Sequence, residues 1–227
     1  MFCSRLNENV FFEITMRETT TDTMDERRRC SWCNTANELY VKYHDEEWGV
    51  AVHDDAHLFE MLVLEMFQAG LSWECVLNKR EAFRRAFDGF DCQMMASYDE
   101  ERIEALAKDM TIIRNRRKIR AAVANARIFI DIQREYGTFD AYIWGWTGGR
   151  TVYERGLSSS SLSDAVSADL RRRGMTFVGT TIVYSYLQAV GIIYSHDKEC
   201  FLYAKRAETN RWSSESRSQT CLDYAES

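Results

Sequence analysis

Apolar side chains recur at helical spacing through the middle of the chain. The clearest stretch runs from Leu58 to Phe67 and breaks at Gly70. The same period predicts further helices over residues 79–87, 99–108, 116–134, 161–173 and 180–191. Alternating β-branched residues are scarce, and turns such as Asp88-Gly89 and Thr147-Gly148-Gly149 separate the helical pieces. The pattern predicts an all-α domain without repeats.

Both ends of the chain are polar and rich in Thr or Ser. This composition predicts disordered tails over residues 1–27 and 207–227, around one domain at 28–206. No uncharged apolar run reaches the roughly 18 residues that a membrane helix needs. Acidic residues near the start, among them Glu8 and Glu13, disfavour a transit peptide. We therefore expect a soluble protein of the cytoplasm, or of the nucleus if the source is eukaryotic, with no membrane partner.

The net charge of −6 arises in the tails, because residues 27–206 carry 25 basic and 25 acidic side chains. A neutral domain still binds nucleic acid if its cations share one face. The densest cationic cluster is Arg114, Arg116, Arg117, Lys118 and Arg120. A solvated helix face is the alternative interpretation of this cluster.

Cysteine and histidine spacing indicates a metal site rather than disulfides. The chain has seven cysteines and no secretory signal, which favours reduced thiols. His196 and Cys200, four residues apart, would share one face of a helical turn, and Cys30 and His44 are candidate partners from the start of the domain. Four such ligands would make a zinc ion structural, because no coordination position stays open.

Two alternatives to this ligand set remain open from spacing alone. Cys33 forms a C-x-x-C motif with Cys30 and would replace either Cys30 or His44 as a ligand. His53 and His57 form a second i,i+4 pair, which a solvated surface beside two aspartates also explains.

Glu65 is a lone carboxylate within the apolar run Leu62–Phe67. Burying such a group is costly unless it has a hydrogen-bond partner, so it either bonds an internal group or faces a ligand. The nearby aromatic residues are Trp32, Tyr40, Tyr43, Trp48 and Trp73. An aromatic box around an acid suits a flat cationic ligand; an ordinary core is the alternative.

Residues 101–120 read as a helix, a short apolar turn and the basic start of a second helix. This pattern is typical of a helix-hairpin-helix, which points backbone N–H groups at a DNA phosphate without reading sequence. A plain antiparallel helix pair is the alternative.

Several strings together resemble the bacterial-type 3-methyladenine DNA glycosylase I family, within the helix-hairpin-helix glycosylases. They are Cys30-Ser-Trp32, Tyr43-His-Asp-Glu-Glu-Trp48-Gly-Val, Leu58-Phe-Glu-Met, Leu64-Glu65, Gln68-Ala-Gly-Leu-Ser-Trp73, Ile112-Ile-Arg-Asn-Arg116 and Arg173-Gly-Met-Thr-Phe-Val-Gly-Thr-Thr-Ile182, with His196 and Cys200. They cover about residues 28 to 203.

The resemblance implies a monofunctional glycosylase that extrudes alkylated bases, chiefly 3-methyladenine, from double-stranded DNA. It implies one zinc ion on Cys30, His44, His196 and Cys200. It also implies Glu65 as the acid that contacts the base. The implied walls of the base pocket are Tyr43, Trp48, Trp73 and Trp32.

For the DNA itself, the resemblance implies that Gly70 and Leu71 fill the gap left in the duplex. We expect Arg114, Arg116 and Lys118 to hold the backbone, and we expect a monomer. Thr111 departs from the family, which usually has glycine at this hairpin position, and a β-branched residue there would be strained at positive φ. A damage-binding module without catalysis and a zinc-stabilised interaction domain are the alternative functions.

Overall fold

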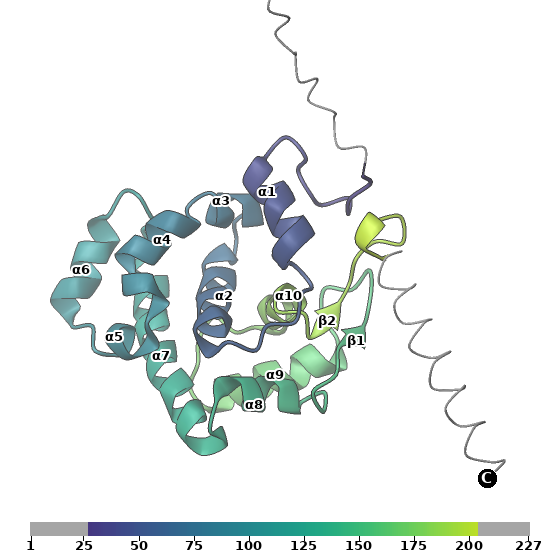
Figure 1. Cartoon of the computed structure of the whole chain (residues 1–227). Coiled ribbons are helices and arrows are strands. Elements are labelled where there is room, and N and C mark those ends of the chain that lie inside the picture. Colours follow the sequence, from purple (N-terminus) through teal and green to yellow (C-terminus); the bar gives the residue numbers. More distant parts are fainter. Residues whose placement is uncertain (1–26, 204–227) are drawn as a thin grey trace, which may run out of the picture.

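The structure, a computed structural model, describes residues 27–203 (Figure 1). The tails predicted over residues 1–27 and 207–227 lie outside the described residues, apart from Arg27. No helix within the described range is long and apolar enough to cross a membrane.

The six helices expected from apolar periodicity all form. They are α2 (Asp55–Gln68), α4 (Arg80–Ala86), α6 (Glu100–Lys108), α7 (Arg116–Tyr136), α9 (Ser161–Arg172) and α10 (Thr180–Ala189). Four of them begin at a side chain that accepts hydrogen bonds from backbone N–H groups of the first turn. These N-caps are Asp54, Asp99, Asn115 and Ser160.

The shorter elements were not predicted. They are α1 (Glu38–Lys42), a π-helical turn η1 (Tyr43–Glu47), α3 (Trp73–Leu77), a 3-10 turn η2 (Asp88–Phe90), α5 (Cys92–Ala96) and α8 (Phe139–Gly145). Each spans two turns or fewer, too few for a period to be recognised. Two strands, β1 (Val152–Tyr153) and β2 (Ile193–Tyr194), also pair in parallel. The described residues are mostly helical, which agrees with the all-α prediction, but this short strand pair, whose partners are distant in sequence, was not predicted.

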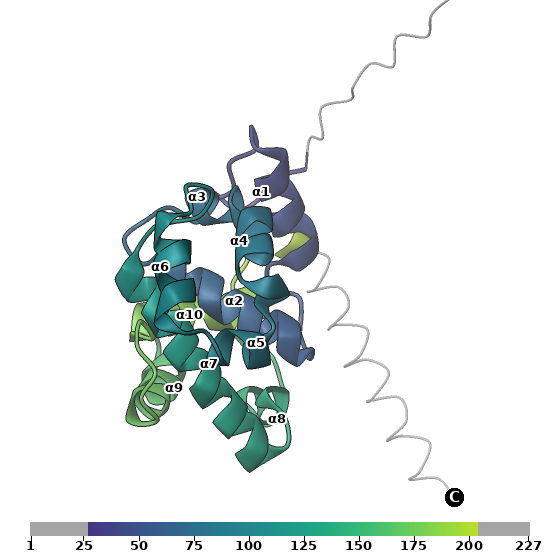
Figure 2. The ribbon, with the colours of Figure 1, turned by 90° about the vertical axis from the view of Figure 1, so that its left-hand side faces the viewer.

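Helix α2 lies at the centre of the molecule. It packs against α10, α7, α3 and α8, and Figures 1 and 2 both show α10 beside it. Helices α4 to α7 gather on one side of this pair, whereas the two ends of the described chain meet on the other side (Figure 1). Phe201 N–H donates to the Arg28 carbonyl at 2.9 Å, so the end of the domain is bonded to its start.

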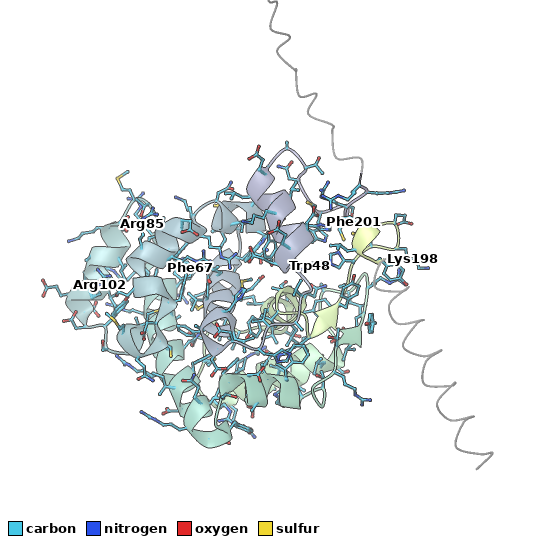
Figure 3. The ribbon with its side chains drawn as sticks, in the orientation of Figure 1. Trp48, Phe67, Arg85, Arg102, Lys198 and Phe201 are labelled. Atoms are coloured by element: carbon cyan, nitrogen blue, oxygen red, sulfur yellow. The ribbon has the colours of Figure 1, made fainter. Side chains whose placement is uncertain are left out.

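The core surrounds α2 on all sides, because every residue from Leu58 to Phe67 is buried. Phe59 packs on Phe129 of α7 with ring centroids 4.8 Å apart. Phe67 of α2 packs on Phe83 of α4 with ring centroids 4.7 Å apart. Figure 3 shows Phe67 on the side of α2 that faces α4. A helix that is buried all round fixes the direction of each of its side chains.

A buried ion cluster joins α2 to the segment before it. Arg80 of α4 is 7% exposed, and its guanidinium donates to Glu60 of α2 at 2.7 Å and to Glu47 of η1 at 2.6 Å. Arg84 also donates to Glu60 at 2.8 Å. These hydrogen bonds and charges hold the pKa of Glu60 below its ordinary value despite burial. Arg80 thereby fixes η1 against α2.

We expect Arg80→Met to lower the free energy of unfolding by about 3 kcal/mol, because removing one partner of a buried ion pair leaves an uncompensated charge. Urea unfolding measures this loss. Arg134→Met, which removes an exposed arginine from α7, is the control and should change stability little. Equal stability of the two variants would contradict a structural role for the cluster.

Candidate base-binding site

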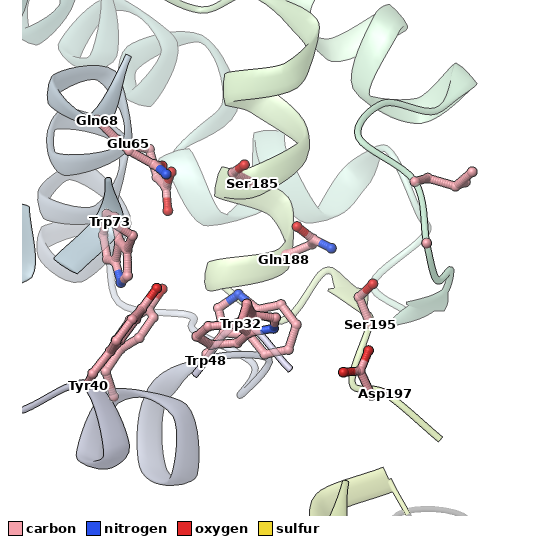
Figure 4. Close-up of a pocket in the computed structure, with 13 residues that line it drawn as sticks. Trp32, Tyr40, Trp48, Glu65, Gln68, Trp73, Ser185, Gln188, Ser195 and Asp197 are labelled. Carbon is pink, nitrogen blue, oxygen red and sulfur yellow. The ribbon is translucent and has the colours of Figure 1, made fainter. Parts of the chain in front are cut away.

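A cavity of about 370 Å³ lies between α2, α10 and the segment that precedes α2 (Figure 4). Its aromatic lining consists of Trp32, Tyr40, Tyr43, Trp48 and Trp73. Its polar lining consists of Glu65, Gln68, Ser185, Gln188, Ser195 and Asp197. The aromatic group singled out in the sequence thus faces a single cavity together with Glu65.

The π-helical turn places two of the aromatic walls. Trp48 N–H donates to the Tyr43 carbonyl at 2.8 Å, which closes the wider turn and holds both side chains on the cavity. Tyr43 packs on Trp73 with ring centroids 5.1 Å apart, and Trp48 meets Trp32 edge-on at 4.7 Å. Aromatic pairs in such tilted and edge-on arrangements are mutually stabilising. The walls therefore form a rigid, flat-sided slot.

Glu65 projects into this slot from α2 (Figure 4) and is 4% exposed. Its Oε2 atom and the Nε1 atom of Trp73 are buried and have no hydrogen-bond partner among the described residues. Burial raises the pKa of Glu65 to about 8. One acceptor and one donor are therefore left for a ligand that enters the slot.

The sequence did not indicate the polar cavity residues that come from α10 and from the segment after β2. Ser185 and Gln188 of α10 line it, as do Ser195 and Asp197 after β2 (Figure 4). Ser185 and Gln188 are three residues apart, so they share one face of α10. Two polar residues at this spacing in the mainly apolar residues 182–189 were the available signal for them.

Cys30, His44, His196 and Cys200 are all buried, and one ligand atom from each lies within 4.8 Å of the others. This group could hold a metal ion. Among the described residues the group excludes Cys33, His53 and His57. His53 instead pairs with Asp140 at 2.8 Å, so the two alternative ligand interpretations are wrong.

The hydrogen bonds around the two histidines suit metal binding. His44 Nδ1 lies 2.8 Å from an Asp45 oxygen, and its Nε2, which accepts from Cys30 N–H at 3.2 Å, lies 3.6 Å from the Cys200 sulfur. His196 Nε2 lies 3.3 Å from the Trp48 carbonyl, which leaves Nδ1 directed at Cys30 Sγ, 3.3 Å away. Such partners on the outer nitrogen fix the tautomer and orientation of a ligating imidazole. Burial also lowers the pKa of His196 to about 4, so the ring is neutral, as a ligand must be.

The Cys/His group and the cavity share their supporting segments. Trp32 follows Cys30 by two residues, Tyr43 directly precedes His44, and Ser195 and Asp197 flank His196. Asp197 also accepts from Ser31 N–H at 2.7 Å. Any ligand that holds the four Cys and His residues together therefore holds one side of the cavity.

Gly70 and Leu71 lie beside the cavity. They line a second hollow of about 340 Å³, which shares Glu65, Gln68 and Ser185 with the first. Gly70 has φ of +79°, which a residue without a side chain adopts easily. Leu71 is 42% exposed although it is a large apolar residue. The turn after α2 therefore presents an apolar tip at the edge of the site.

Residues 101–120 form a helix pair, α6 and α7, joined by a turn. Thr111 does not have a positive φ, so the expected strain at this position is wrong. Instead, its N–H and hydroxyl both donate to Asp109 Oδ1, at 2.8 and 2.6 Å, and the side chain of Asp109 stabilises the turn without glycine. Arg114 is exposed, whereas Arg116, also exposed, forms an ion pair with Glu104 of α6.

Lys118 is not on the exposed basic face, contrary to the prediction. It is 4% exposed, and its ammonium donates to the carbonyls of Phe67 and Ala69 at 2.8 and 2.6 Å. The reason is helical geometry: two residues beyond the exposed Arg116, the side chain turns toward α2. In this structure Lys118 cannot contact a DNA phosphate.

A second helix pair, α9 and α10, was not assigned a role from the sequence, and its helix α10 borders the same hollow. Thr181 and Ile182, in the first turn of α10, line the hollow beside Gly70 and Leu71. Gly179 precedes this helix, no side chain caps it, and a Cβ at Gly179 would meet nothing within 4 Å. The first N–H groups of α10 are thus left open. In the sequence, the glycines at positions 174 and 179 were the available signal for the turn between α9 and α10.

Comparisons with known proteins agree on one family. Residues 32–203 match the family model described as methyladenine glycosylase. The chain is 42% identical over 181 residues to DNA-3-methyladenine glycosylase 1 of Escherichia coli (strain K12), covering 77% of this chain and 96% of that protein.

Solved structures give the same result. A crystal structure of 3-methyladenine DNA glycosylase I has a TM-score of 0.74 and 40% identity, covering 77% of this chain and 98% of that one. A variant of 3-methyladenine DNA glycosylase I in complex with 3-methyladenine has a TM-score of 0.73 and 30% identity, with 76% and 96% covered.

We expect the stability of the parental protein to fall relative to that of Glu65→Gln as the pH rises from about 5 to 8. The folded-state pKa of about 8 lies above the ordinary 4.5, so the native state holds a proton that the unfolded chain has released. Raising the pH then costs roughly 1 kcal/mol per unit until the pH passes 8. Urea unfolding of both proteins across this range measures the difference. A difference that stays constant with pH would show that Glu65 does not titrate as a buried acid.

Proposed function

This chain belongs to the methyladenine glycosylase family, and from that premise we propose that it hydrolyses the N-glycosyl bond of alkylated bases in DNA, chiefly 3-methyladenine, in base excision repair. The observation that carries the proposal is the unpartnered oxygen of Glu65 inside an aromatic slot. The relative in complex with 3-methyladenine supports the choice of base.

The slot suits a flat cationic base. Its volume of about 370 Å³ lies within the range of small-molecule sites. Ring faces attract the positive charge of a base methylated at N3. That charge would also favour the ionised form of Glu65, whose carboxylate then accepts the N–H groups of the base. A charge-assisted hydrogen bond of this kind contributes about 1.5–3 kcal/mol, which neutral adenine would gain only in part. The pocket therefore selects damaged bases by charge.

The chemistry needs little acid assistance. A base methylated at N3 already carries positive charge, so it leaves with the electron pair of the glycosidic bond and becomes neutral. A water molecule adds to the sugar carbon and loses a proton. The enzyme mainly offsets the few kcal/mol that extrusion of the base costs. None of the described residues that line the cavity is a lysine, which supports a monofunctional enzyme without Schiff-base chemistry.

We assign double-stranded DNA to the surface around Gly70 and Leu71. Leu71, exposed at the edge of the site, would fill the gap left by the extruded base. The open N–H groups at the start of α10 and the exposed Arg114 and Arg116 would hold phosphates of the duplex. Both helix pairs then act as helix-hairpin-helix elements. A monomer acting in the cytoplasm, or in the nucleus of a eukaryote, stays our prediction.

The ion that fits the Cys/His group is zinc. Two sulfurs and two imidazole nitrogens are its usual tetrahedral donors, and four protein ligands leave no open position. Cys30, His44, His196 and Cys200 would hold it. The ion would supply stability rather than chemistry, because it would join the two ends of the domain.

We expect Cys200→Ser to lose stoichiometric zinc and to melt at a lower temperature than the parental protein. Metal analysis and thermal unfolding with and without a chelator measure both. Tryptophan fluorescence should change as well, because Trp32 and Trp48 lie against His44 and His196. Cys75→Ser, at a free thiol outside the group, is the control. Parental protein that contains no zinc and is indifferent to chelation would overturn the assignment.

We expect Glu65→Gln to release 3-methyladenine roughly 10 to 100 times more slowly in single-turnover assays, since each 1.4 kcal/mol lost is about tenfold. Zinc content and affinity for undamaged duplex should stay unchanged. Glu38→Gln, at an exposed position of α1, should retain the parental rate.

The same assay tests the function as a whole. An enzyme leaves an abasic site in the duplex, whereas a damage-binding module retains the alkylated base. Parental release rates in Glu65→Gln would mean that Glu65 is an ordinary core residue.

A further inference from the structure

The buried ammonium of Lys118 bonds the last carbonyls of α2. Its Nζ atom lies 2.8 Å from the Phe67 oxygen and 2.6 Å from the Ala69 oxygen. The last carbonyls of a helix have no partner within the helix, and they form the negative end of its dipole. The last turn of α2 contains no basic residue of its own. Lys118, from the first turn of α7, therefore supplies the missing positive charge.

The carbonyls that Lys118 bonds flank a functional turn. Gln68, between Phe67 and Ala69, lines the base cavity. Gly70 and Leu71 follow directly and line the adjoining hollow. Within the turn, Leu71 N–H donates to the Gln68 carbonyl at 2.6 Å. Burial ends here: residues up to Phe67 are buried, whereas Gly70, Leu71 and Ser72 are exposed. Side-chain packing therefore fixes α2 but does not fix this turn.

Lys118 also lies close in sequence to the exposed arginines of the α6–α7 turn. Asn115 caps α7 by accepting from Arg117 N–H and Lys118 N–H. Arg114 and Arg116, the latter paired with Glu104, are exposed on the same short segment. The start of α7 thus carries exposed arginines and, through Lys118, hydrogen bonds to the end of α2.

We propose that Lys118 is a positioning residue for base extrusion, which holds the Gln68–Leu71 turn at the edge of the cavity and couples it to the arginine-bearing start of α7. This rests on the proposed function of the site. Lys118 lines neither the base cavity nor the adjoining hollow. It acts through Leu71, whose side chain enters the duplex only if the turn is held. Desolvation lowers the pKa of Lys118, and the two carbonyl oxygens keep the ammonium hydrogen-bonded.

The test distinguishes an effect of Lys118 on the turn from an effect on base binding in the pocket. Lys118→Met preserves the shape and removes both hydrogen bonds, whereas Lys118→Gln retains an N–H donor for one carbonyl. Arg134→Met, at the other end of α7, is the matched control for loss of a cation. Three readouts apply: single-turnover release of 3-methyladenine from duplex, fluorescence of 2-aminopurine next to an abasic-site analogue as a report of unstacking, and binding of free 3-methyladenine by tryptophan quenching.

We expect Lys118→Met to slow release from duplex roughly tenfold and to weaken the 2-aminopurine signal, with unchanged affinity for free 3-methyladenine. Lys118→Gln should recover part of the rate. Leu71→Ala and Lys118→Met should combine to less than the product of their separate effects, because both act on one step.

Three results would overturn the inference. They are an unchanged rate in Lys118→Met, loss of free-base affinity together with the rate, and multiplicative effects with Leu71→Ala. Failure of the proposed function looks different, because the parental protein would then release no base at all. The unstacking and free-base measurements would still report on Lys118 in that case.

Discussion

The base-binding site depends on two buried carboxylates of one helix that lie in opposite electrostatic environments. Glu60 and Glu65 both lie on the buried α2. Arg80 and Arg84 donate hydrogen bonds to Glu60, and its pKa is lowered. Glu65 has an oxygen without a partner, and its pKa is raised. A carboxylate without a counter-ion is costly to bury, so the rest of the domain must be stable enough to hold it. A cationic ligand can supply the hydrogen-bond partner that this Glu65 oxygen lacks.

The surroundings of Glu65 are held from two sides. Arg80 bonds η1 to α2 and so fixes the turn that carries Tyr43. On the other side, the Cys/His group joins the start of the domain to its end, and the residues next to its members form cavity walls. No residue of the ion cluster or of the Cys/His group lines the cavity itself. Stability and binding geometry are therefore supplied by the same contacts, which preorganise the site before a ligand arrives.

The edge of the site is built differently from its interior. The walls are packed aromatic rings, whereas the turn after α2 is exposed and is tied to α7 through Lys118. The turn that we propose inserts into a duplex must be both apolar and exposed, so side-chain packing cannot hold it. Hydrogen bonds from a neighbouring helix to its backbone can. This explains why a lysine within a basic sequence cluster is buried, against expectation.

The long helices could be predicted from the sequence, because apolar periodicity and capping side chains act locally. Residue type alone also singled out Glu65, the aromatic residues and the Cys/His pairs. Spacing alone left Cys33 and the pair His53 and His57 as rival ligands. Only the tertiary structure excluded them, because ligand geometry joins residues far apart in the chain. It likewise turned Lys118 inward, gave Thr111 an Asp109 partner and brought the two strands together. Each of these features depends on which neighbour packs against the residue. A local sequence pattern does not contain that information.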